Sequence, residues 1–263
     1  MKVFLETTRL ILRQITENDA DNLFELDSDI DVIRFANLGV IKGGQPINTD
    51  YDTIVNQTLP RIIYYYQKYE CYGFWAAIEK LSNEFIGWFH FRPALDSQFN
   101  VNSGLYNTND IELGYRLKKS AWGKGYATEG SRALILKGFS ELDTQKVVSS
   151  ALAANIASIR VMEKAGLKFE RKFIHPEIEP EVVKYSLSKD EFKLEEYEWK
   201  YNRLPSRCDR TLVQQLKANF LQCSTQPLRQ YDPTNLSLKV ALLDAFEETQ
   251  HFPLLQQLPK LIL

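Results

Sequence analysis

The residues best suited to chemistry lie in a glycine-containing turn between a predicted strand, Ile111–Leu117, and a predicted helix. The turn and the helix start read Lys118-Lys119-Ser120-Ala121-Trp122-Gly123-Lys124-Gly125-Tyr126-Ala127-Thr128-Glu129. Glycines at such a junction let backbone N–H groups converge at the positive end of the helix. Lys118, Lys119 and Lys124 add positive charge. The pattern is suited to a pyrophosphate, and it is also typical of a simple tight turn.

Three further segments accompany this turn. The preceding strand carries Ile111-Glu112-Leu113-Gly114-Tyr115, and a second helix opens with Asn155-Ile156-Ala157-Ser158 and ends in Lys164-Ala165-Gly166-Leu167-Lys168-Phe169. Near the N-terminus stands Glu6-Thr7-Thr8-Arg9-Leu10-Ile11-Leu12-Arg13. In this order and spacing the motifs resemble GNAT-type N-acetyltransferases. They are most similar to the branch that includes the ribosomal-protein alanine and serine N-acetyltransferases. The resemblance covers about Glu6–Lys189 and leaves the substrate open.

The resemblance implies that an acetyl group moves from acetyl-CoA to a primary amine by direct attack within a ternary complex. Gly125 and Ala127 take the two small-residue positions of the family's pyrophosphate signature, and Trp122 stands where Gln or Arg is usual. Asn155 matches a position that contacts the pantetheine arm, and Asn is also a common helix N-cap. The residues implied to bind acetyl-CoA are Leu117, Lys119, Trp122, Gly123, Lys124, Gly125, Tyr126, Ala127, Thr128 and Asn155.

Proton transfer has three candidate side chains. Glu112 is the candidate general base, and its alternative role is a solvated carboxylate at a strand edge. An α-amine with a pKa near 7.8 is about 14% neutral at pH 7, against about 0.04% for a lysine side chain, so an α-amine needs less help. The resemblance implies the Leu117 backbone N–H as oxyanion donor. Ser158 or Tyr185 would protonate the leaving thiolate, although each is also an ordinary residue of its helix or strand.

The predicted elements place these residues on a single mixed sheet. Strands are expected at Thr8–Ile15, Gly73–Glu79, Glu84–Phe91, Asp110–Leu117, Val147–Ala151, Lys168–His175 and Glu181–Leu187. Helices are expected after Thr16 or Asn18 and at Tyr51–Tyr69, Trp122–Phe139 and Asn155–Ala165. This order predicts an α+β fold, a GNAT-like, mostly antiparallel mixed sheet flanked by helices. The polar loop Asp96–Asn109 is long for a hairpin and is expected to be either mobile or functional.

Composition excludes several other classes of protein. The chain has 263 residues, a formal net charge of −2, three Cys and three His. The near-neutral charge gives no reason to expect nucleic acid or a membrane as partner. No apolar run is long enough for a membrane span, and no secretory signal is apparent, which favours a cytoplasmic protein. The scattered Cys and His residues offer no metal site, so no metal is expected.

The chain divides into two predicted parts. Residues 6–190 form the acetyltransferase-like domain, and residues 201–263 form a helical C-terminal extension with Leu212, Leu216 and Phe220 at helical spacing. This extension is too apolar for a disordered tail. Three roles are open: docking on its own domain, formation of a homodimer, or attachment to another partner.

Two other functions compete with acetyl transfer. The first is a catalytically silent acyl-CoA-binding or regulatory module of the same fold, which only a turnover measurement separates from an enzyme. The second is a nucleotide-binding protein of the Rossmann kind. It is disfavoured because the turn follows antiparallel strands and because the Gly-x-Gly-x-x-Gly pattern is incomplete.

Overall fold

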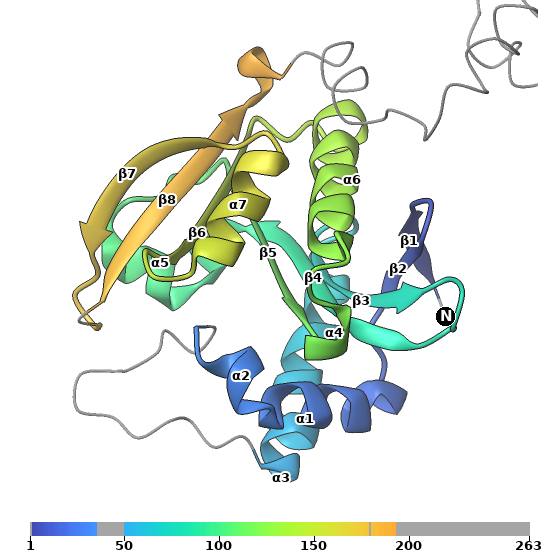
Figure 1. Ribbon diagram of the computed structural model, residues 1–263. Helices are drawn as coiled ribbons and strands as arrows, with labels where there is room; N and C mark the ends of the chain where they lie inside the picture. The colour runs from blue at the N-terminus through green and yellow to red at the C-terminus, as the bar shows by residue number, and fades with distance from the viewer. Residues whose placement is uncertain (1, 36–49, 179, 193–263) are drawn as a thin grey trace, which may run out of the picture. The chain divides into compact units, whose positions relative to one another are not determined.

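The computed structural model describes residues 2–35, 50–178 and 180–192. Within these ranges eight strands form one sheet in the order β1-β2-β3-β4-β5-β6-β8-β7 (Figure 1). The strands are β1 (Val3–Glu6), β2 (Leu10–Gln14), β3 (Gly73–Glu79), β4 (Phe85–Pro93), β5 (Asp110–Leu117), β6 (Lys146–Leu152), β7 (Lys168–Ile174) and β8 (Glu181–Ser188). The helices are α1 (Ala20–Ser28), α2 (Ile30–Ile33), α3 (Tyr51–Thr53), α4 (Leu59–Lys68), α5 (Gln98–Ser103), α6 (Tyr126–Glu141) and α7 (Ile156–Lys164).

The pairing of β5 with β6 divides the sheet into two halves. All other neighbouring strands are antiparallel, whereas β5 and β6 are parallel and pair only over Asp110–Glu112 and Lys146–Val148. Beyond these residues the two strands diverge (Figure 1). We call the space between residues 113–117 of β5 and 149–152 of β6 the β5–β6 opening. It leads to the turn that precedes α6.

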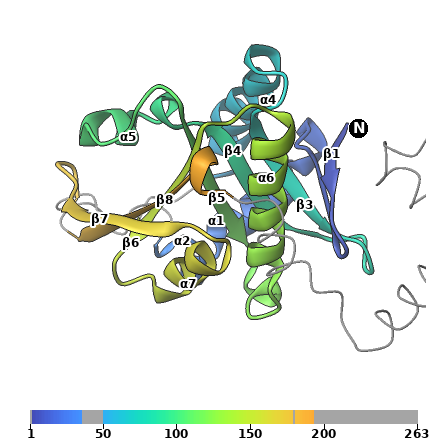
Figure 2. The same ribbon diagram turned by 90° about the horizontal axis from the view of Figure 1, so that it is seen from above.

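Two hydrophobic cores cover opposite faces of the first half-sheet. Helix α6 packs over Phe89, Phe91 and Leu113. It lies close to the sheet because its glycines leave room for aromatic rings: a Cβ at Gly130 would lie 2.3 Å from the Phe89 ring, and a Cβ at Gly138 would lie 2.6 Å from Phe91. The opposite face packs residues of α1 and α4 against β3. Seen from above, α5 and α7 lie on opposite sides of β7 and β8 (Figure 2).

The predicted α+β fold with a mostly antiparallel sheet is confirmed, and β5 has the predicted bounds. Strand β1 was not predicted, because its four residues are too few to show an alternating pattern. Two local predictions were wrong. The helix expected from Trp122 begins at Tyr126, since Gly125 adopts a left-handed conformation as its N-cap. The loop expected at Asp96–Asn109 contains α5. The predicted helices of residues 201–263 lie outside the described residues.

Candidate active site

The glycine turn has the backbone shape that an anion site requires. Gly123 and Gly125 have φ angles of 73° and 86°, the left-handed region that favours glycine. A Cβ on Gly123 would meet no atom within 4 Å, so the space above the turn is open. Gly125 is the N-cap of α6, which starts with Tyr126, Ala127 and Thr128 and directs its first N–H groups toward this space. The turn therefore fits a pyrophosphate, and binding itself stays a prediction.

Leu117 closes β5 and presents its backbone N–H to the β5–β6 opening. Leu117 lies opposite Gly87, and the next amide, that of Lys118, donates to the Ile86 carbonyl at 2.8 Å. This register makes Leu117 and Gly87 a non-hydrogen-bonded pair, so the Leu117 N–H points away from β4. The Trp122 indole Nε1 donates to the Leu117 carbonyl at 2.8 Å. Trp122 thus fixes the end of β5 at the position where the family usually has Gln or Arg.

Arg9 anchors the turn, and sequence reasoning assigned it no role. Its Nη1 donates to the Lys124 carbonyl at 2.9 Å, and its guanidinium pairs with Glu129 in the first turn of α6 at 2.6 Å. The Thr7 hydroxyl and the Arg9 backbone N–H both donate to the other Glu129 oxygen. The guanidinium also lies 4.5 Å from the centroid of the Tyr126 ring. The signal available in the sequence was the N-terminal motif Glu6–Arg13, on which the resemblance partly rests.

The two lysines after β5 pair with acidic residues of α1 and α2. Lys118 contacts Glu25 at 2.6 Å, and Lys119 pairs with Asp31, which raises the pKa of Lys119. Glu25, Lys118 and Lys119 border a hollow of about 440 Å³ between α1–α2 and the turn. Acidic residues of α1 and α2 therefore partly neutralise the positive charges of Lys118 and Lys119, which the sequence predicted to act at the turn.

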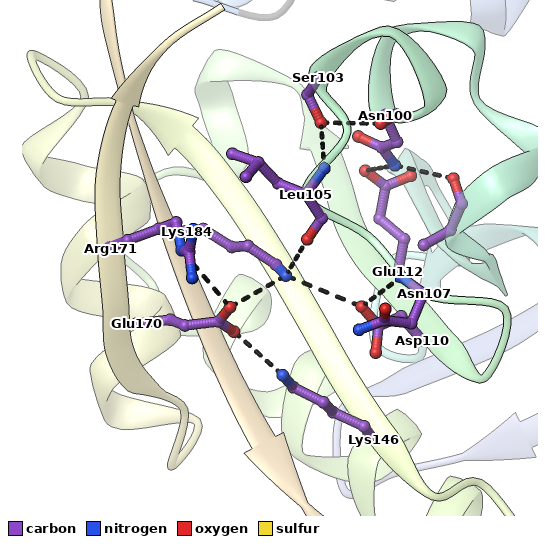
Figure 3. Close-up of polar contacts among 11 residues, drawn as sticks. Asn100, Ser103, Leu105, Asn107, Asp110, Glu112, Lys146, Glu170, Arg171 and Lys184 are labelled. Atoms are coloured by element: carbon purple, nitrogen blue, oxygen red, sulfur yellow. Dashed lines mark hydrogen bonds and ion pairs between the residues drawn. The ribbon is translucent and has the colours of Figure 1, made fainter.

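Glu112 is buried in a polar cluster on the face of the sheet opposite to Tyr115 and Leu117. Arg92 on β4, directly across the strand pair, donates to Oε2 from Nε at 3.2 Å and from Nη2 at 2.9 Å. The Asn100 amide of α5 donates to Oε1 at 2.9 Å (Figure 3). Burial alone would raise the pKa of Glu112, but the charge and hydrogen bonds of Arg92 and the hydrogen bond from Asn100 outweigh it and hold this pKa below its ordinary value. Glu112 is therefore neither the solvated edge carboxylate nor an exposed base.

His90 completes this cluster as a neutral group. Its Nε2 lies 3.5 Å from the Glu112 carboxylate, and its ring fills the space that a Cβ on Gly114 would need. Burial and the nearby Arg92 lower the pKa of His90 to about 3, so the imidazole is uncharged at neutral pH. The pairing of β4 with β5 was the signal that would have placed Arg92 and His90 beside Glu112.

A second buried cluster lies beside the short parallel pairing of β5 with β6, where the β5–β6 opening ends. Lys184 of β8 is 1% exposed and donates to the Leu105 carbonyl at 2.7 Å and to Glu170 at 3.2 Å. Its Nζ lies 3.7 Å from Asp110, the first residue of β5 (Figure 3). Lys146, at the start of β6, contacts Glu170 at 3.1 Å. These ion pairs join the two half-sheets where their parallel pairing is only three residues long.

The three predicted residues near α7 have different surroundings. Asn155 is the N-cap of α7, since its Oδ1 accepts from the Ser158 N–H at 3.1 Å, which confirms the capping role. The Ser158 hydroxyl meets the Tyr115 hydroxyl of β5 at 3.1 Å, across the opening. Tyr185 instead donates to the Glu163 carboxylate at 3.1 Å. The structure thus brings Leu117, the turn and Ser158 to one opening, and it places the hydroxyl of Tyr185 on Glu163.

Comparisons with known proteins agree with this geometry. A family model described as "Acetyltransferase (GNAT) domain" matches residues 9–168. The FsC-acetyl coenzyme A-N(2)-transacetylase of Aspergillus fumigatus is 27% identical over 194 residues, covering 72% of this chain and 77% of that protein. The solved structure of a GNAT-family acetyltransferase from Bacillus anthracis is 22% identical, covers 71% of this chain and 99% of its own, and has a TM-score of 0.55. RimL, a ribosomal L7/L12 alpha-N-protein acetyltransferase solved with coenzyme A, is 16% identical over 73% of this chain and 100% of its own, with a TM-score of 0.56.

The chain belongs to the GNAT acetyltransferases, because the family model matches more than half of its residues. It is an acetyl-CoA-dependent acyltransferase, and acetyl-CoA is its co-substrate. Among the described residues, no helix has the length and apolar character needed to span a bilayer.

Proposed function

We propose that this protein transfers the acetyl group of acetyl-CoA to a primary amine, either a peptide α-amine or the amine of a small molecule, by direct attack in a ternary complex. One observation carries the proposal: the β5–β6 opening ends at the left-handed glycine turn and has the Leu117 N–H directed into it. A thioester beside β5 would therefore have its phosphates at the turn and its carbonyl oxygen near an N–H donor.

The chain's own groups would do the following in this reaction. The N–H groups after Gly125 hold the pyrophosphate at the positive end of α6. The Leu117 N–H donates to the oxygen that becomes negative in the tetrahedral adduct. The Asn155 side chain keeps the start of α7 in place through Ser158. These roles need backbone groups more than side chains, which explains why Trp122 is tolerated in the signature.

Glu112 serves in this proposal as a fixed negative charge. A base must accept a proton, and a carboxylate whose pKa is lowered and whose two oxygens already accept from Arg92 and Asn100 is a weak one. An α-amine does not need a strong base, because being about 14% neutral at pH 7 costs only about 1.2 kcal/mol. We propose that water at the β5–β6 opening takes the amine proton, while Glu112 holds Arg92 in place beside His90.

A silent acyl-CoA-binding module of the same fold would also fit the engagement of Glu112 by Arg92 and Asn100, but the family assignment supports an acyltransferase. Release of free CoA separates the two. The purified chain is incubated with acetyl-CoA and a panel of N-terminal peptides and small amines, and thiol release is followed. Amine-dependent release that Gly125→Asp abolishes supports the enzyme. Acetyl-CoA binding without release on any amine supports the silent module.

A further inference from the structure

One buried lysine reaches from one half of the sheet to the other. Lys184 belongs to β8 and lies opposite Ser150 of β6, yet its Nζ is 3.7 Å from the Asp110 carboxylate at the start of β5. Because β6 lies between β8 and β5, the Lys184 side chain passes over β6 (Figure 3). Ser150 lies two residues beyond Val148, the partner of Glu112 on β6. Lys184 therefore shares a face of the sheet with Glu112.

Lys184 has partners on both sides of the parallel pairing. Its Nζ donates to the Leu105 carbonyl, in the segment that leads into β5, at 2.7 Å and to the Glu170 carboxylate of β7 at 3.2 Å. Burial alone would raise the pKa of Glu170, but hydrogen bonds from Lys146 and Lys184 help to hold this pKa below its ordinary value, so Glu170 is a carboxylate. Lys184 thus lies between two acidic side chains, Asp110 of the first half-sheet and Glu170 of the second.

The contacts of Lys184 continue into the Glu112 cluster. The Leu105 N–H donates to the Ser103 hydroxyl at 3.2 Å, and this hydroxyl donates to the Asn100 carbonyl at 2.7 Å. The Asn100 side chain in turn donates to Glu112 at 2.9 Å (Figure 3). A continuous network therefore links Lys184 on β8 with Glu112 on β5 by way of α5. It holds β5 at both ends of its three-residue pairing with β6.

The width of the β5–β6 opening depends on how the two strands are held at this end. Beyond Glu112 and Val148 their edges no longer pair, and Leu117 stands at the far end of β5. The path along β5 from Glu112 to Leu117 is about 17 Å long, at about 3.4 Å per residue. A change of about 5° in the angle between β5 and β6 would therefore move Leu117 by about 1.5 Å relative to β6. Such a shift is larger than a hydrogen bond tolerates, because N···O distances range over only about 0.5 Å.

We infer that Lys184 is a positioning residue that sets the angle between β5 and β6 and thereby the fit of the CoA arm in the β5–β6 opening. The inference rests on the proposed acetyl transfer. The arm is the part of CoA that joins the pyrophosphate to the sulfur, and it would reach from the glycine turn to the Leu117 N–H. Lys184 touches neither CoA nor the acceptor amine, and it acts through β5. The pyrophosphate site lies at the start of α6, which packs on the first half-sheet, so phosphate binding should not depend on Lys184.

The test compares the binding of CoA with that of ADP, which carries a pyrophosphate and no arm. Dissociation constants are measured with the full chain, by calorimetry for CoA and by NMR titration for ADP. We expect Lys184→Met to weaken CoA binding at least tenfold and ADP binding less than twofold, because only the arm enters the opening. Lys172→Met is the matched control, since it removes an ion pair with Glu181 that lies within β7 and β8. It should change neither affinity by more than twofold.

Asp110→Asn is a milder second variant, and it decides the question if Lys184→Met does not fold. It removes the charge that faces Lys184 and keeps a side-chain oxygen for the Asn107 N–H, which donates to Asp110 at 3.0 Å. We expect this variant to weaken CoA binding about threefold and ADP binding less than twofold.

The possible outcomes are separable. A loss confined to CoA in both variants, with Lys172→Met unchanged, supports the inference. CoA affinity within twofold of the unsubstituted chain in Asp110→Asn and in folded Lys184→Met overturns it. Equal losses for CoA and ADP also overturn it, because they would show that Lys184 maintains the fold as a whole, and both results leave acetyl transfer standing. An unsubstituted chain that binds CoA but not ADP overturns it as well, since the turn would then not hold the pyrophosphate by itself. Failure of the unsubstituted chain to bind CoA would contradict the proposed function itself.

Discussion

Replacing Glu112 with Gln should destabilise the fold by about 3 kcal/mol at neutral pH. The carboxylate accepts from Arg92 on one oxygen and from Asn100 on the other. A Gln amide must turn its NH₂ group toward one of these donors in either orientation. The change also leaves Arg92, whose side chain is 15% exposed, without its counter-charge. Breaking a buried pair costs about 3–5 kcal/mol, and the Tyr65 hydroxyl, 3.4 Å from Arg92, keeps the expected loss at the lower end.

Urea unfolding of the full chain at several pH values measures this loss. The folded-state pKa of Glu112 lies below its ordinary value of 4.5, so its contribution is complete above about pH 4.5 and is lost as pH falls through the lowered folded-state pKa. The difference between the two chains should therefore be constant from neutral pH down to mild acid and shrink below it. Glu25→Gln is the control, because Glu25 is 67% exposed in its pair with Lys118 and should cost less than about 1 kcal/mol.

Two results would refute this reasoning. A loss for Glu112→Gln no larger than that of Glu25→Gln would show that the buried cluster is energetically unimportant. An unchanged difference through the acid range would show that the charge of Glu112 is not what matters. The turnover number of Glu112→Gln gives a second test. If Glu112 is a fixed charge, the loss of turnover should not change with pH. If Glu112 is a general base, the loss should shrink as pH rises and the acceptor amine deprotonates.

Two further predictions concern the turn. Gly125→Asp should weaken acetyl-CoA binding at least tenfold, about 1.4 kcal/mol, because it adds a carboxylate at the phosphate position. Calorimetry checks this against Gly104→Asp, a left-handed glycine with no atom near its Cβ position, and equal affinity in both variants would be inconsistent with the placement of the site. Arg9→Met should weaken acetyl-CoA binding about threefold to tenfold, since Arg9 holds the Lys124 carbonyl and the start of α6. Lys80→Met removes a neighbouring surface ion pair with Glu6 and should leave acetyl-CoA affinity unchanged. Equal losses of affinity in the two variants would show that Arg9 has no special role at the turn.

The parts of the site that sequence predicts well are those that depend on local backbone. The left-handed Gly123 and Gly125 and the cap by Asn155 follow from residue type at one position in the chain. The β5 bounds follow from a strong strand pattern. Such features need no knowledge of what packs against them.

The parts that sequence could not supply depend on distant partners. The surroundings of Glu112 come from Arg92 twenty residues earlier and from Asn100 on a helix with no apolar periodicity. Whether a carboxylate is a free base or a buried counter-charge is decided by these contacts. In the same way, the sequence does not distinguish Tyr185 from Ser158 as a proton donor. The structure does, because the Tyr185 hydroxyl donates to Glu163 whereas the Ser158 hydroxyl lies beside the Tyr115 hydroxyl.

The central claim, acetyl transfer at the β5–β6 opening, is tested most directly by following the acetyl group. Cell lysate is supplied with isotopically labelled acetyl-CoA and the purified chain, and mass spectrometry locates the label. The proposal predicts label on the nitrogen of one class of primary amine with the unsubstituted chain and none above background with Gly125→Asp. Labelled acetyl-CoA that is bound by the chain but never transferred to any amine would contradict it.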